Sequence, residues 1–87
     1  MKLQGAIIKE QGVTFAIVIV KSHLLNNQQQ ARDAQTGFAR FFPGLPIILM
    51  AQNSSGVPTY YGRKDIVRFL SGIYFERIPW KEYTFAA

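Results

Sequence analysis

The sequence contains no cysteine and a single histidine, His23. Without thiols the chain forms no disulfide, and it lacks a thiolate nucleophile, a dithiol redox centre and cysteine ligands for zinc or an iron–sulfur cluster. His23 lies in KSHLL, and the nearest acid in the sequence, Asp33, falls within the following predicted helix. A catalytic histidine usually depends on a carboxylate that orients it. We therefore interpret His23 as a loop residue without a catalytic role, and we predict no metal site and no cofactor.

Acidic residues are scarce, with five against ten lysines and arginines. No two acids form a close pair in an apolar setting, so paired-carboxylate hydrolysis is not indicated. The sequence also lacks the GxSxG nucleophile motif, the phosphate-binding loop and the GxGxxG motif. Ser54 and Ser55 stand in NSSG, where both residue types favour a turn. The polar residues therefore predict no enzymatic activity.

Long hydrophobic runs are missing as well. The longest, FAIVIV at residues 15–20, is far too short to cross a bilayer. Near the N-terminus, Lys2 is followed by an apolar run of only three residues, Ala6 to Ile8. A secretory signal needs a longer apolar region. We therefore expect a cytoplasmic protein with no membrane partner.

The 87 residues carry a net charge of +5; 48% of them are hydrophobic and 17% are charged. This length predicts one domain, residues 1–87, with a thin core. The cations are spread over the whole chain and form no block. A basic protein is attracted to nucleic acid and to acidic membranes, but a nucleic-acid binder usually shows a basic stripe. The charge therefore permits a nucleic-acid partner without indicating one.

The hydrophobic pattern predicts an α+β fold with the element order ββαββα, followed by a C-terminal tail. The expected strands are residues 2–10, 13–21, 45–52 and 57–62, and the expected helices are residues 26–44 and 63–72. Asn27 precedes Gln30 by three residues, which is the spacing of a helix cap. Pro58 cannot donate a ladder hydrogen bond, so its strand belongs at an edge. We expect a mixed four-stranded sheet with one helix on each face.

Segment 13–21 is apolar on both of its faces. One face carries Phe15, Ile17 and Ile19, and the other carries Ala16, Val18 and Val20. A strand of this kind is normally covered on both sides. Either a helix lies on each side of the sheet, or a helix covers one side and an oligomer contact covers the other.

The C-terminal tail is rich in aromatic residues. Residues 74–87 hold Tyr74, Phe75, Trp80, Tyr83 and Phe85. Disordered tails are poor in aromatics, so we expect this tail to pack back onto the domain, with a turn at Ile78–Trp80 and a short extended end. Large rings also serve as contact surface for partners, and we predict an interaction surface formed by Tyr61, Trp80, Tyr83 and Phe85.

From Thr14 to Ile73, the order βαββα resembles the C-terminal half of the thioredoxin-like fold. Pro46 stands where that family has its cis-proline before a strand, NSSG stands at the hairpin, and Gly62 precedes the last helix. The resemblance implies two helices on opposite faces of the sheet. The N-terminal half departs from the family, and without cysteine its redox activity does not carry over. The chain also resembles short bacterial proteins for which no activity is known.

The segment YGRKD, at the start of the second predicted helix, is the best candidate for a ligand site. Free N–H groups at a helix start attract anions, and a glycine lets the backbone approach closely. The candidate anion-binding residues are Gly62, Arg63, Lys64 and Arg68. They would bind a phosphate-containing ligand or, with Tyr61 as a stacking ring, single-stranded nucleic acid. The alternative is that Asp65 offsets the helix dipole and the cations are solvated.

Two functions follow from these features. The first is a small non-catalytic interaction module, with a protein partner or as a homodimer. It is indicated by the apolar surface of segment 13–21, the aromatic tail and the missing catalytic groups. The second is a binder of phosphate-containing ligands or single-stranded nucleic acid at Gly62, Arg63 and Lys64.

Overall fold

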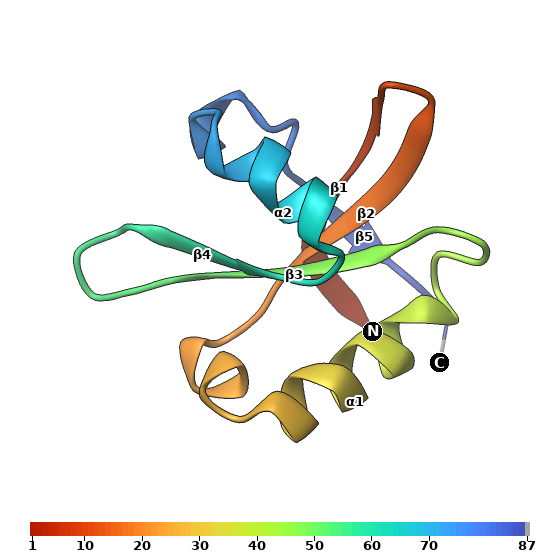
Figure 1. Cartoon of the computed structure of the whole chain (residues 1–87). Helices are drawn as coiled ribbons and strands as arrows, with labels where there is room; N and C mark the ends of the chain where they lie inside the picture. Colours follow the sequence, from red (N-terminus) through yellow and green to blue (C-terminus); the bar gives the residue numbers. More distant parts are fainter. Residues whose placement is uncertain (87) are drawn as a thin grey trace.

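A mixed sheet of five strands, in the order β4-β3-β2-β1-β5, forms the middle of the protein (Figure 1). The computed structural model describes residues 1–86. The strands are β1 (Lys2–Glu10), β2 (Val13–Ile19), β3 (Ile47–Gln52), β4 (Pro58–Tyr61) and β5 (Lys81–Thr84), and the helices are α1 (Gln28–Ala39) and α2 (Lys64–Ser71). Two short 3-10 helices, η1 (Ser22–Asn26) and η2 (Phe75–Arg77), lie in the connections. Strands β2 and β3 are parallel, and the other neighbours are antiparallel.

Turns join two of the three antiparallel pairs, β1 with β2 and β3 with β4. Gln11 and Gly12 connect β1 to β2 with φ values of 51° and 79°. Positive φ at both central residues is typical of the type I′ turn, whose twist matches that of the strands. Between β3 and β4, the Asn53 side chain accepts hydrogen bonds from the N–H groups of Ser55 and Val57, at 2.9 Å each. The predicted NSSG hairpin is thereby confirmed.

The two helices lie on opposite sides of the sheet, and each covers one face of β2 (Figure 1). Phe15 and Ile17 belong to the core cluster that contains the α2 residues Ile66 and Leu70. Ala16 and Val18 belong to the other cluster, which the α1 residue Ala31 joins. The four β2 side chains are at most 1% exposed. Within residues 1–86, both apolar faces of β2 are therefore covered by the same chain.

The sheet has five strands rather than the expected four. Residues 81–84 pair with residues 2–5 of β1, and the Phe85 N–H donates to the Met1 carbonyl at 2.8 Å. The tail therefore packs back as expected, but as part of the sheet. Strand β5 has only four residues, two of which, Lys81 and Glu82, are charged, so its sequence shows no strand pattern. It becomes a strand by pairing with β1, which is distant in the sequence.

Helix α1 is shorter than predicted, since it ends at Ala39 rather than near Gly44. Hydrogen bonds from the N–H groups of Phe41 and Phe42 to carbonyls three residues earlier replace the last turns with tighter ones. The helix start agrees with the prediction, because the Asn27 side chain accepts from the Gln30 N–H at 3.1 Å. The edge position of β4 is likewise confirmed. The peptide bond before Pro46 is trans, unlike that of the thioredoxin-like family.

Candidate functional site

Of the predicted anion-binding residues, Gly62, Arg63 and Lys64 lie at the start of α2, whereas Arg68 lies in its last turn. Arg63 already has a partner. Its Nε and one terminal nitrogen donate to the two carboxylate oxygens of Asp65 at 2.8 and 2.9 Å. The hydrogen bond from Arg63 lowers the pKa of the Asp65 carboxyl. Lys64 and Arg68 are exposed and form no ion pair within residues 1–86.

Gly62 has a packing reason that needs no ligand. A Cβ atom added there would lie 2.6 Å from Ile48 Cδ1 and 3.1 Å from the Ile47 carbonyl oxygen. A side chain there would therefore displace the Ile48 side chain and crowd the β3 backbone, and the φ of 152° is one that other residues rarely adopt. This close approach to the sheet accounts for the glycine before α2.

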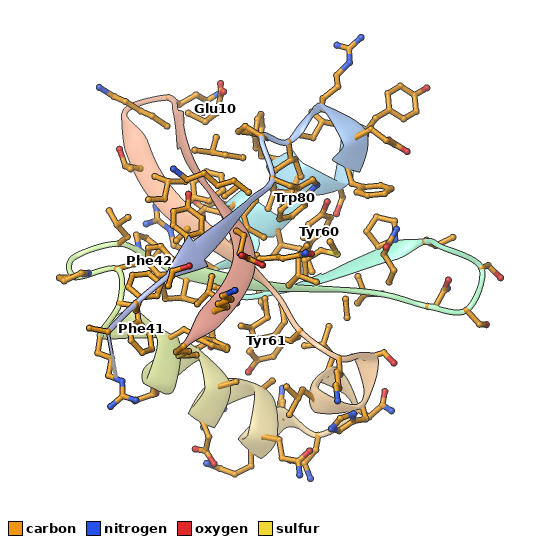
Figure 2. The ribbon with its side chains drawn as sticks, turned by 180° about the vertical axis from the view of Figure 1, so that it is seen from behind. Glu10, Phe41, Phe42, Tyr60, Tyr61 and Trp80 are labelled. Atoms are coloured by element: carbon orange, nitrogen blue, oxygen red, sulfur yellow. The ribbon has the colours of Figure 1, made fainter. Side chains whose placement is uncertain are left out.

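The predicted aromatic surface is divided between the two faces of the sheet (Figure 2). Trp80 packs against the α2-side core, and its Nε1 donates to the Phe75 carbonyl at 2.8 Å. Tyr61, Tyr83 and Phe85 pack against the α1-side core. All four predicted residues are half-buried. Trp80 lies on the opposite face of the sheet from the other three, so the four do not form one continuous surface.

A cluster of four rings explains why the tail is ordered. Phe42, only 5% exposed, meets Tyr83 and Phe85 edge-on, with ring centroids 5.5 and 5.7 Å apart. The ring centroids of Phe41 and Phe85 lie 4.7 Å apart. Edge-to-face contacts of this kind stabilise beyond the area that they bury. We call Phe41, Phe42, Tyr83 and Phe85 the ring cluster; its rings hold β5 to the end of α1.

The outer edge of β4 leaves backbone groups without a partner among residues 1–86. The Asn53 N–H donates to the Val57 carbonyl at 3.0 Å, and the register is unbroken along β4. Bonded and non-bonded pairs alternate in an antiparallel ladder. Thr59 therefore exchanges hydrogen bonds with β3, whereas the backbone groups of Pro58 and Tyr60 face outward. Since Pro58 has no N–H, the free groups along β4 are one N–H, from Tyr60, and two carbonyls.

A groove of about 380 Å³ lies beside this edge, between the β4 hairpin and the chain that follows α2. We call it the β4 groove; its lining residues are Gly56, Val57, Pro58, Tyr60, Leu70, Ser71, Ile73, Tyr74, Phe75 and Glu76. Two of its hydrophobic residues are unusually open to solvent, with Val57 55% and Tyr74 74% exposed. Exposed apolar residues gathered around a groove are typical of a contact site.

The Tyr60 hydroxyl makes the β4 groove chemically distinctive. This oxygen is buried and has no hydrogen-bond partner among residues 1–86. Burial, reinforced by the nearby Glu76 carboxylate, raises the pKa of Tyr60. Figure 2 shows Tyr60 on the α2 side of the sheet and Tyr61 on the α1 side. Because buried polar groups are rarely left unpaired, this enclosed hydroxyl lowers the stability of the folded chain and is accessible to a ligand only if the side chains around it shift.

Val57, Tyr60 and Tyr74 were not among the site residues predicted from the sequence. A usable signal was present, since residues 53–62 contain no charged side chain although the chain is basic. Edge strands of monomeric proteins commonly carry charge. No feature of the sequence predicts that Tyr74 lies across the groove, because its position depends on how the chain turns after α2.

No helix within residues 1–86 is long and apolar enough to cross a membrane. The same residues bring no three histidine or acidic side chains together as metal ligands. The chain matches no protein-family model, no curated protein and no solved structure. Functional inference therefore rests on the geometry of the β4 edge and its groove.

Proposed function

We propose that this chain is a small non-catalytic protein-interaction module that binds an extended segment of another polypeptide along β4. The observation that carries the proposal is the free, uncharged β4 edge directly beside an apolar groove. Addition of a strand to a sheet edge gives affinity through backbone hydrogen bonds, and a neighbouring pocket gives specificity through alternate side chains. The β4 edge and the β4 groove offer both elements together.

The geometry favours this function over anion binding at the start of α2. The Arg63 guanidinium is engaged by Asp65, and packing against β3 accounts for Gly62. Lys64 and Arg68 are the cations of the predicted set that have no carboxylate partner among residues 1–86. Anion binding at the start of α2 is tested by NMR titration with inorganic phosphate and with a single-stranded oligonucleotide. It requires changes in the chemical shifts of residues 60–68 at low salt. Location in the cytoplasm stays a prediction.

The test is an NMR titration of the labelled protein with the blocked, uncharged hexapeptide Ser-Val-Thr-Val-Thr-Ser. We expect amide shifts at residues 57–62 and at residues 70–76, across the groove. Thr59→Lys, which places a charge on the exposed edge, should weaken these shifts strongly because a charged edge strand resists pairing. Thr84→Lys on the exposed part of β5 is the matched control and should leave them unchanged.

Two results would count against a module of this kind. One is the absence of shifts at millimolar peptide, with the protein folded by circular dichroism. The other is an equal loss of the shifts in Thr59→Lys and Thr84→Lys. Sedimentation analysis over a wide concentration range tests for a homodimer, in which a second copy would occupy the β4 edge.

A further inference from the structure

The β4 groove has an unbalanced charge. Among its lining residues, Glu76 is the one acidic residue, and no lysine or arginine is present. The charge of the groove is therefore opposite in sign to that of the chain, which has ten basic and five acidic residues. Glu76 is exposed, so its carboxylate is available to a ligand in the groove.

The remaining lining is suited to an aliphatic segment with a polar backbone. Ile73 and Phe75, which are half-buried, supply apolar contact in front of the fully buried Leu70. The Tyr60 ring belongs to the same lining, while its hydroxyl oxygen is enclosed. In an extended chain, alternate side chains point to the same side. One row of side chains would therefore face the groove while the backbone pairs with β4.

We propose that the partner is a different protein, which presents an extended segment with aliphatic side chains at alternate positions and a lysine or arginine that meets Glu76. This inference rests on the proposed function and adds the chemistry of the partner. The cation complements the one charge in the groove, and the aliphatic side chains cover Val57 and Tyr74.

A second copy of the chain fits the groove less well. Two copies joined edge to edge through β4 into one continuous sheet would place both α2 helices on the same side. The two Glu76 carboxylates would then also lie on that side, and neither groove would gain a cation from the other's lining. Each copy also carries a net charge of +5, which opposes association. Pro58 leaves each edge one donor short.

The experiment compares blocked hexapeptides that differ in one charge. In Ser-Val-Thr-Val-Thr-Ser, a single lysine or a single glutamate replaces each position in turn, and affinities are measured by NMR titration at low and high salt. We expect the preference at one position of the hexapeptide, or at two positions that are two residues apart and so face the same side. There the lysine peptide should bind about two- to fivefold more tightly than its glutamate counterpart, as for an exposed ion pair. Salt should reduce this preference.

Variants at Glu76 decide whether that residue causes the preference. Glu76→Gln should abolish it and Glu76→Lys should reverse it, whereas Glu82→Gln on β5 should leave it intact. Glu76 and Glu82 are both exposed, so these variants should fold. A lysine preference that survives Glu76→Lys overturns the inference. If all peptides bind equally at β4, the inference fails and the proposed function stands; if none binds, both fail. Concentration-dependent dimerisation through β4 would identify a second copy as the occupant and would also overturn the inference.

Discussion

The two edges of the sheet are built in opposite ways. Strand β4 lies at one edge in a stretch, residues 53–62, that has no charged side chain. Strand β5 lies at the other edge, is equally short, and places Lys81 and Glu82 among its four residues. Edge strands expose backbone groups that can pair with any other chain, and proteins commonly suppress this with charge. By this criterion β5 is a protected edge and β4 an available one.

Packing separates the two edges in the same direction. The ring cluster and the Arg40 guanidinium, 5.0 Å from the Phe41 ring, cover the residues beside β5. Beside β4 lies the groove, with Val57 and Tyr74 exposed and the Tyr60 hydroxyl unpaired within residues 1–86. Both outer edges leave backbone groups without a partner among residues 1–86, so the edges differ in their side chains: those beside β5 pack on one another, whereas those beside β4 leave an open groove.

The largest effect should come from removing the centre of the ring cluster. Phe42→Ala deletes the buried ring that contacts both Tyr83 and Phe85, and we expect a loss of about 3–4 kcal/mol in the free energy of unfolding. The β5 amides should lose protection from hydrogen exchange first, because that ring holds the strand. Urea unfolding and hydrogen exchange measure the two effects.

Phe41→Ala is the control for Phe42→Ala, since Phe41 is less deeply buried and contacts Phe85 alone within the cluster. It should cost less than half as much. Equal costs, or a loss of protection at β4 rather than β5, would show that the ring cluster does not complete the β5 edge.

Much of the fold followed from local patterns in the sequence. A run rich in β-branched residues identified β2, Asn27 marked the helix start, and Pro58 placed β4 at an edge, because each effect acts within a few residues. Strand β5 was not predicted, since four residues with two charges gain strand structure only by pairing with the start of β1.

None of the site residues predicted from the sequence lines the β4 groove. Tyr61 and the residues from Gly62 to Arg68 flank the β4 groove in sequence without lining it. The groove depends on residues 56–60 meeting residues 70–76, and that proximity is set by the packing of α2 on the sheet. No spacing rule connects these two segments, so their meeting was visible only in three dimensions.

A smaller effect should come from the Tyr60 hydroxyl. Tyr60→Phe removes a buried group that has no partner within residues 1–86, so we expect the protein to become more stable by about 1 kcal/mol. If a ligand carbonyl completes this hydroxyl, the same variant should bind the hexapeptides more weakly. Urea unfolding and the peptide titration together measure this opposition of stability and binding.

The pH dependence of the stability of Tyr60→Phe provides a second test. Burial and Glu76 raise the pKa of Tyr60 above its ordinary value of 10.0, so the folded state holds the proton more tightly than the unfolded state. The wild type should therefore lose stability as the pH rises above 10.0, and Tyr60→Phe should lose less. Tyr83→Phe on β5 is the control and should change stability by less than about 0.5 kcal/mol. Equal effects of the two variants would remove the distinction between the edges.

The smallest change in stability, and the most direct test of edge protection, should come from the β5 charges. Glu82 lies 4.0 Å from the Lys2 ammonium, and the Lys81 ammonium lies 4.7 Å from the Tyr83 ring. Exposed contacts of these kinds contribute little, so Lys81→Thr with Glu82→Thr should cost no more than about 1 kcal/mol. The β5 edge would then be uncharged, as β4 is, and should associate with other copies at high protein concentration. Sedimentation analysis measures this association. A doubly substituted protein that stays monomeric would mean that charge does not distinguish the edges, and the availability of β4 would then rest on its groove alone.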